Sequence, residues 1–193
     1  MNLLGRKFSG SGSCATIGLT NGSDNNTISG AKILGAPNQA GILLSGSSNN
    51  LLADIVLENF DRDGLWLNSA PGTSVSKVLL RNGRSGFAAH IADSDNCRLD
   101  NITVENSFNG IEIYQSMATV LSNFFVGIRD TYGLYLSYAS GSSVFKGEVE
   151  NPDREAVPAP APLGQYGIYL EYSDNNILSS IRIGTTRSST ART

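Results

Sequence analysis

Hydrophobic and polar residues follow a pattern that repeats along most of the chain. Each unit begins with a glycine, which is followed by an apolar residue, any residue and usually a second apolar residue. The spacings between successive units are 23, 23, 22, 24, 23 and 34 residues. A period this regular is typical of a solenoid, in which each unit forms one coil. The glycines that begin the units are Gly18, Gly41, Gly64, Gly86, Gly110, Gly133 and Gly167.

The alternation after each glycine predicts a short strand with one buried side. A polar turn rich in glycine, asparagine and serine follows, and a second strand then runs to an asparagine. Asparagine tolerates left-handed backbone, and its amide can bond to the same residue of the next coil. We therefore expect Asn59 and Asn106 to belong to such a ladder. The asparagines at which the second strands are expected to stop are Asn59, Asn82, Asn106 and Asn151.

Units of this length, with no helical spacing, predict a coil built of β-strands only. Strands of successive coils then lie roughly 4.8 Å apart, so that equivalent residues stack. In these features the chain resembles the right-handed parallel β-helix proteins of the pectate-lyase-like superfamily, which includes phage tailspikes and polysaccharide lyases, hydrolases and epimerases. The resemblance covers residues 18–184 and implies an all-β, right-handed parallel β-helix of about seven coils. The catalytic motifs of these enzymes are absent, so the resemblance implies no catalytic residues.

The repeat predicts a single domain over residues 1–193. Regular coils occupy about residues 18–184, and a polar tail follows at 185–193. Residues 151–166 interrupt the sixth coil with four prolines, which cannot join a strand ladder. Insertions in solenoids lie on one face, which is often the binding face.

Composition excludes several classes of partner. The net charge of -3 argues against nucleic-acid binding, which needs a basic surface. No apolar run is long enough to span a membrane, and the opening residues lack the apolar centre of a signal peptide, so no membrane partner is expected. The location expected of such a protein is extracellular or virion-associated.

The cysteines and the acidic turn are interpreted as structural. Cys97 lies in a column with Val75 and Val120, so its side chain should point into the core. Cys14 lies far from it in the stack, and a disulfide between them is not expected. Asp93 and Asp95 could hold calcium, but a structural turn is the better interpretation, because the aligned SSNN and DNNI segments of other units are also turns. No metal-ligand spacing is found, and neither a metal nor another cofactor is predicted.

Outward positions gather unusual residues on one face. If the first and third residues after each glycine point inward, the second and fourth point outward on one sheet. Rings and carboxylates in such a row suit a sugar chain, because rings pack against sugar faces while polar groups bond hydroxyls. The same rings would also stabilise stacked coils without any ligand. The residues expected to bind a sugar chain are Trp66, Asn68, Arg84, Arg129, Asp130, Tyr135, Tyr169 and Glu171.

The candidate catalytic residues are His90, Tyr114 and Glu112. His90 and Tyr114 fall in the same column of adjacent coils, where one could remove a proton beside a uronate carboxylate and the other return one. Arg84 or Arg129 would neutralise that carboxylate.

Hydrolysis instead needs two carboxyl groups at a suitable separation. Glu112 and Glu171 are two coils apart, about 10 Å by strand spacing, which is marginal. Glu112 with Asp130 is another pairing, as are Asp61 and Asp63 beside Trp66. Each of these carboxylates could equally be a surface charge paired with an arginine.

The function predicted from the sequence is a polysaccharide-processing β-helix protein, with lyase or epimerase chemistry ahead of glycoside hydrolysis. An alternative is a non-catalytic receptor-binding or structural segment of a phage tailspike or cell-surface protein, for which a homotrimer is expected. A third interpretation is a bare scaffold with no ligand.

Overall fold

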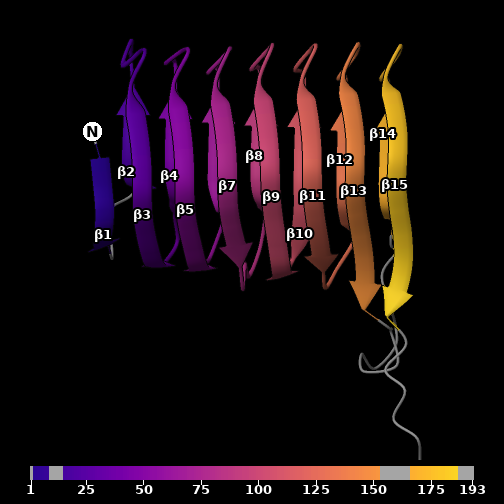
Figure 1. The fold of residues 1–193 in the computed structure, drawn as a ribbon, viewed down its shortest axis with the longest axis horizontal. Coiled ribbons are helices and arrows are strands. Elements are labelled where there is room, and N and C mark those ends of the chain that lie inside the picture. Colours follow the sequence, from indigo (N-terminus) through magenta and orange to yellow (C-terminus); the bar gives the residue numbers. More distant parts are fainter. Residues whose placement is uncertain (1, 9–14, 153–165, 187–193) are drawn as a thin grey trace, which may run out of the picture.

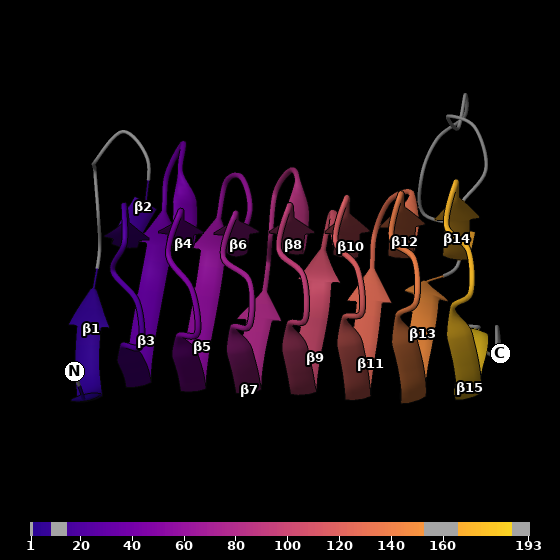
Figure 2. The same cartoon turned by 90° about the horizontal axis from the view of Figure 1, so that it is seen from above.

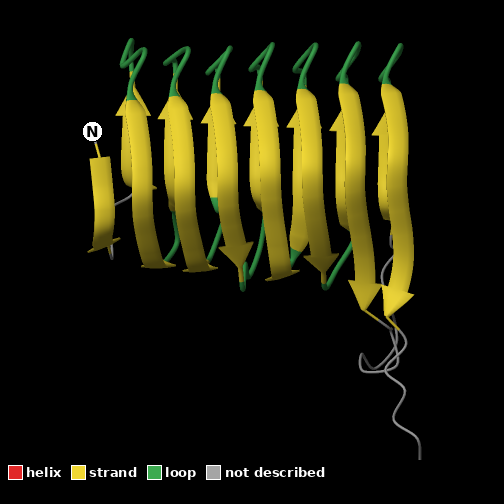
Figure 3. Cartoon of the chain, viewed as in Figure 1, coloured by secondary structure: helices red, strands yellow, loops and turns green. Residues whose placement is uncertain are grey.

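The chain forms a parallel β-helix in which two sheets face each other across a narrow core (Figures 1 and 2). The computed structural model describes residues 2–8, 15–152 and 166–186, and Figure 3 shows strands and turns but no helix among them. Successive strands alternate between the sheets, and every pairing within a sheet is parallel. The seven strands of the smaller sheet correspond to the expected seven coils.

The eight-stranded sheet contains the longer strands, in the order β1-β3-β5-β7-β9-β11-β13-β15. Their bounds are Asn2–Phe8, Thr27–Ala36, Leu51–Phe60, Ser74–Arg81, Arg98–Ser107, Val120–Ile128, Ser143–Pro152 and Ile177–Thr186. The seven-stranded sheet has the order β2-β4-β6-β8-β10-β12-β14. Its bounds are Ala15–Thr20, Ala40–Ser45, Leu65–Asn68, Phe87–Ala92, Asn109–Tyr114, Tyr132–Ser137 and Tyr166–Glu171.

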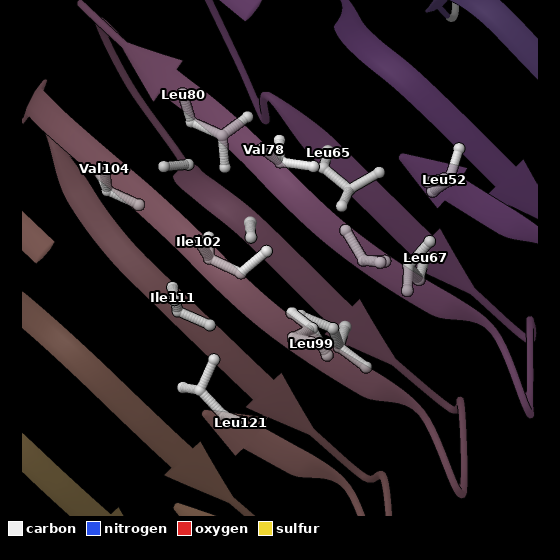
Figure 4. Close-up of a cluster of buried hydrophobic side chains, with 14 of the residues drawn as sticks. Leu52, Leu65, Leu67, Val78, Leu80, Leu99, Ile102, Val104, Ile111 and Leu121 are labelled. Carbon is white, nitrogen blue, oxygen red and sulfur yellow. The ribbon is translucent and has the colours of Figure 1, made fainter. Parts of the chain in front are cut away.

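The core consists of stacked columns of aliphatic side chains, as the alternation predicts. Figure 4 shows Leu65 and Ile111 of the seven-stranded sheet gathered with Val78 and Ile102 of the eight-stranded sheet. Each fully buried side chain of this size contributes roughly 1.5–3 kcal/mol. One column of the seven-stranded sheet is fully buried along five successive strands and contains Leu44, Leu67, Ile91, Ile113 and Leu136.

The expected asparagine ladder is confirmed. Asn59, Asn82 and Asn106 adopt left-handed backbone, with φ of 58°, 59° and 49°. Asn82 Nδ2 donates to Asn59 Oδ1 (3.4 Å), and Asn106 Nδ2 donates to Asn82 Oδ1 (2.9 Å). Asn151 behaves differently, because it pairs with Thr185 inside the β13–β15 ladder and the strand does not stop there.

A second ladder satisfies backbone groups inside the turns that leave the seven-stranded sheet. The Ala70 N–H donates to Ser94 Oγ (2.8 Å), and the Ser94 N–H donates to Ser116 Oγ (2.9 Å). Both serines are fully buried. The buried N–H groups of Ala70 and Ser94 therefore have hydrogen-bond partners, although they lie in turns and outside the strand ladders.

Five of the repeated glycines lie where neighbouring coils approach closely, namely Gly41, Gly64, Gly110, Gly133 and Gly167, whereas a Cβ atom at Gly18 would meet nothing within 4 Å. A Cβ atom at Gly110 would collide with the backbone oxygen of Gly133 and with Cγ1 of Val126. Any larger residue there would push successive coils apart.

Two units are displaced from the predicted register. In the first unit, Gly18 pairs with Leu43, and Thr20 pairs with Ser45. Thr20 therefore occupies the fourth position after the start of its unit, where the sequence predicted the second. In the fourth unit, Leu65 pairs with Ala89 and Trp66 pairs with His90. The prediction was wrong by two residues there because Gly86 belongs to the preceding turn. Buried Ala88 stands where other units have glycine, since a small residue is sufficient.

Cys97 is fully buried, as predicted, but it lies in a different column. Its backbone oxygen accepts a bond from Val120, while Arg98 donates to Thr73, so Cys97 is level with Thr73. Burial raises the pKa of the Cys97 thiol to about 11, which leaves it protonated and unreactive. Cys14, the proline-rich stretch at 153–165 and residues 187–193 lie outside the described residues.

The last coil exposes residues whose equivalents elsewhere are buried. Leu170, Leu178 and Ile183 are 40%, 37% and 58% exposed, whereas their register partners in the preceding coil are fully buried. They are exposed because no described coil covers them. In the part of the chain that the structure describes, no helix is long and apolar enough to cross a membrane.

The asparagine ladder yields a stability prediction. Replacing Asn82 by alanine should lower the free energy of unfolding by about 1–2 kcal/mol, because alanine is strained in left-handed backbone and both amide bonds are lost. Asn82→Gly should lower it less, because glycine has no such strain. Urea unfolding of both variants measures the difference. Equal losses in the two variants would show that backbone strain has no part in the effect.

Candidate functional site

Five successive strands of the seven-stranded sheet present one outward row of side chains. The register pairs Trp66 with His90, His90 with Glu112, Glu112 with Tyr135 and Tyr135 with Tyr169. The row therefore brings together five predicted site residues that lie up to about a hundred positions apart in the sequence. All five side chains are partly exposed.

His90 is the centre of this row and lies between two carboxylates. Its Nε2 is 3.2 Å from Glu112 Oε2, and its Nδ1 is 3.8 Å from Asp63 Oδ2. The His90 side chain is 21% exposed, and both carboxylate side chains are 12% exposed. The ring of Trp66 lies nearly parallel to the imidazole at 5.9 Å between centroids. The group is thus a half-buried carboxylate–imidazole–carboxylate array, which we call the His90 array (Asp63, His90 and Glu112).

Asp63 is held in place by the turn that precedes β8. Its Oδ1 accepts a hydrogen bond from the Phe87 N–H at 2.9 Å. Gly86 in that turn has a φ of +65°, and a Cβ there would lie 2.7 Å from Asp63 Oδ1. Only glycine allows the turn to close around the carboxylate.

The surroundings raise the pKa values of His90 and Glu112. Burial lowers the pKa of His90, but contact with Asp63 and the charges of Glu112, Asp63 and Asp93 outweigh it, so the net pKa is raised. The pKa of Glu112 is raised by burial and by the charge of Asp63, against the opposing charge of His90. The imidazole therefore stays protonated to higher pH than usual, and the Glu112 carboxyl group keeps a proton to higher pH than an ordinary glutamate.

Aromatic rings extend from the array toward the last coil. Tyr132, Tyr135, Tyr166 and Tyr169 form a tyrosine cluster with centroid distances between 4.7 and 5.7 Å. Phe87 connects this cluster to the array, since its ring lies 6.1 Å from His90 and 6.4 Å from Tyr135.

Tyr135 also connects the tyrosine cluster to a carboxylate. Its hydroxyl donates to Glu171 Oε2 at 2.5 Å. Burial, together with this bond, raises the pKa of Tyr135 to about 12. The phenol therefore remains a proton donor and does not ionise in the physiological range.

Tyr132 and Tyr166 were not predicted to belong to the site, and Asp63 was named as a hydrolytic alternative. Phe87 was expected to point inward as the first residue after Gly86, but it is partly exposed and lies beside His90. All four occupy one place in the repeat, immediately before the small residue that begins each unit. Phe87 pairs with Asn109, and Tyr132 pairs with Tyr166. An aromatic residue directly before Ala88, Gly133 and Gly167 was the signal that could have identified three of them.

Tyr114 does not lie beside His90, and this part of the catalytic prediction is wrong. Tyr114 pairs with Ala92 and Ser137, and its ring meets the edge of Tyr138 at 6.3 Å. The error follows from the two-residue displacement of the fourth unit. The residue of β10 that lies beside His90 is Glu112, and on its other side Glu112 pairs with Tyr135 of β12.

Asn68 and Glu171 lie in the fourth-position column. Asn68 pairs with Ala92, and Glu171 pairs with Ser137. Both point outward, as predicted, beside the row that contains the His90 array.

The predicted turn residues are occupied by local contacts. Arg84 Nη1 lies 3.0 Å from Asp61 Oδ1, and Arg129 Nη2 donates to the Gly83 oxygen at 2.6 Å. Asp130 Oδ2 accepts from the Thr131 hydroxyl at 2.8 Å. The acidic turn is also structural, since Asp95 Oδ1 accepts from the Met117 N–H at 2.7 Å.

The stacked parallel coils define the class of this protein as a right-handed parallel β-helix. The chain belongs to the NosD family, because the family model described as "Periplasmic copper-binding protein (NosD)" matches residues 24–191. A comparison with curated proteins finds no match.

Solved structures that match this chain at low identity include two epimerases and a glucanase. A mutant of the periplasmic alginate epimerase AlgG is 11% identical with a TM-score of 0.43, and the match covers 80% of this chain and 50% of that one. The Azotobacter vinelandii mannuronan C-5 epimerase AlgE4 A-module is 11% identical with a TM-score of 0.35, covering 88% and 64%. A GH87 α-1,3-glucanase catalytic domain is 10% identical with a TM-score of 0.27, covering 89% and 55%. The chain thus spans about half of AlgG, and at these identities no residue roles transfer.

The side chains present do not fit the copper of the family description. Among the described residues, no group of three or more His, Cys, Asp or Glu side chains could hold a metal ion. In the His90 array the two carboxylates lie at different ring nitrogens of His90 and do not share one ligand position with it. The single histidine of the chain has a carboxylate at each ring nitrogen, and Cys97 is sealed in the core. Met117, a soft ligand, is 55% exposed on a turn. The described side chains therefore offer copper no set of converging ligands.

The raised pKa of His90 can be measured directly, because the chain contains one histidine. In NMR titration of tag-free protein, the His90 pKa should exceed the ordinary value of about 6.5. Glu112→Gln and Asp63→Asn should each lower it, because each removes a negative charge beside the ring. An unchanged pKa in both variants would contradict the ion pairs of the His90 array.

The same shift predicts a pH dependence of stability. A raised pKa means that the charged ring stabilises the fold fully below about pH 6.5, and that this contribution is lost as pH rises through the raised value. Urea unfolding from pH 5.5 to about pH 9 should therefore show a steeper loss in the wild type than in His90→Gln. Parallel curves for the two proteins would contradict the assignment.

Proposed function

We propose that this chain is a polysaccharide-processing protein, with a sugar chain lying across the strands of the seven-stranded sheet and the His90 array performing acid–base chemistry on it. The observation that carries the proposal is the array itself. A half-buried imidazole between two carboxylates lies on an outward face and is flanked by aromatic rings. Perturbed titratable groups of this kind cluster at functional sites.

The geometry supports a division of roles within the array. Glu112, with its raised pKa, can hold a proton and deliver it to a bound sugar, and His90 at 3.2 Å can exchange that proton. Asp63 acts as a positioning residue, because its carboxylate is bonded to the Phe87 N–H and faces the other imidazole nitrogen. The proton can thus be removed and returned at one point of the face.

The aromatic rings supply the binding surface of the proposal. Trp66 lies on one side of the array, while Phe87 and the tyrosine cluster lie on the other. Their partly exposed edges and hydroxyls offer apolar contact and hydrogen bonds to successive sugars. Because the row runs across the strands, each coil contributes one side chain to it, and successive side chains start from strands about 4.8 Å apart.

The reaction type divides into two possibilities. Elimination or epimerisation at a uronate uses a base and a cation, and Arg84 or Arg129 was expected to provide that cation. Hydrolysis uses a protonated carboxyl group, for which Glu112 is the best-placed candidate. We assign the chain to the periplasm or the extracellular space, in keeping with the family description.

A polysaccharide assay tests the proposed function. The protein is incubated with a panel of neutral and uronic-acid polysaccharides, and new unsaturated ends and reducing ends are measured together. Glu112→Gln and His90→Gln should lower turnover at least about 100-fold, the usual size of an acid–base contribution, with binding retained. Trp66→Ala should weaken binding.

The matched control is Glu105→Gln, an exposed glutamate on β9 of the opposite sheet. It should leave binding and turnover unchanged. Binding without turnover in the wild type would favour the non-catalytic receptor-binding alternative, for which a trimeric mass in solution is expected. Absence of binding to every polysaccharide would refute the proposal.

A further inference from the structure

The seven-stranded sheet carries charge of only one sign, apart from His90. None of its strands contains lysine or arginine, and their charged residues are His90, Glu112 and Glu171. The opposite sheet differs, since outward Lys32 and Arg81 pair there with Glu58 at 3.3 and 2.8 Å. The contrast shows that cations are available to this fold but are absent from the proposed sugar-binding face.

In the described turns that border the face, each arginine has an aspartate close to it. Arg84 is paired with Asp61, and exposed Arg62 lies between Asp61 and Asp63 in the sequence. Arg129 bonds to a backbone oxygen and is followed by an aspartate in the sequence. The described turns therefore add no excess of positive charge to the face.

The one cation within the face is already neutralised. Protonated His90 has Asp63 and Glu112 at its two nitrogens, so the His90 array carries a net negative charge when both carboxylates are ionised. Glu171 adds another carboxylate beside Tyr135. Because these groups are half-buried, water and salt screen them less than they screen fully exposed charges.

From this distribution we infer that the face selects an uncharged glycan and rejects polyuronates. This inference rests on the proposed function and names the substrate class of the same site. A polyuronate brings one carboxylate with each sugar and would place several of them beside Glu112 and Glu171 without a partner. A neutral glycan brings hydroxyl groups, which donate hydrogen bonds to those carboxylates and accept them from tyrosine hydroxyls.

The inference also bears on the chemistry. Elimination and epimerisation remove a proton beside a sugar carboxyl group, which a neutral glycan lacks. An uncharged substrate therefore leaves hydrolysis as the reaction that the His90 array could support.

The test compares neutral glycans with their own oxidised forms. Each neutral glycan of the panel is used before and after oxidation of its C6 hydroxymethyl groups to carboxylates, and binding is measured by affinity electrophoresis or calorimetry. At low salt, oxidation should weaken binding at least about tenfold, as expected for several unpaired like charges. About 0.5 M salt should restore part of the loss, while binding of the neutral form should change little.

Two variants locate the effect. Glu171→Gln keeps an acceptor for the Tyr135 hydroxyl but removes a charge, so it should reduce the discrimination against the oxidised form several-fold. Glu105→Gln on the opposite sheet should not change it. Equal or tighter binding of the oxidised glycans or of natural polyuronates would overturn the inference while leaving the proposed function intact. Failure of all glycans to bind would instead refute the proposed function, and the inference with it.

Discussion

The structure depends on in-register parallel bonding between each coil and the next. The bonding continues through the turns, where the Gly72 N–H donates to the backbone oxygen of Asp95 (2.8 Å) and the Asn96 N–H donates to the backbone oxygen of Met117 (2.9 Å). Strand bonds and turn bonds therefore hold one register around the whole coil. Every ladder described above, whether aliphatic, asparagine, serine or aromatic, follows from this constraint, because a side chain can only stack on its equivalent one coil away.

This dependence explains what the sequence could predict. Interior columns were predictable because a core filled from both sheets takes apolar side chains, and Leu44, Leu67 and Ile113 carry that signal at the expected place after the glycine. The outward row was predictable for Trp66, Glu112 and Tyr135, whose units begin at true repeat glycines.

The error in the fourth unit has one physical cause. Glycine serves two purposes in this fold, close packing between coils and left-handed turns, and the sequence does not distinguish them. Gly86 is a turn glycine followed by an apolar residue, so its sequence context matches that of a glycine that begins a unit. The residue that packs between coils in this unit is Ala88, which the glycine pattern does not identify. The partnership of His90 with Glu112 was therefore hidden, although both residues were named as candidates. The contribution of Asp63 could not be predicted because it depends on the shape of a turn.

The outward faces of the two sheets carry different kinds of side chain. The eight-stranded sheet carries surface ion pairs of mixed sign, which suit a solvated exterior. The seven-stranded sheet concentrates rings and acids around a single histidine, which is the one imidazole that the chain could offer to copper. Among the described residues, no group of three or more potential ligand side chains could hold a metal ion, so the local chemistry does not fit the copper of the family description.

The aromatic row joins five separate coils, because each of its members comes from a different strand. In a solenoid, each coil is held only by its neighbours, so one part of the stack can open while a distant part stays closed. A ligand that contacted the whole row would therefore brace several coils at once, and its binding would slow their local opening.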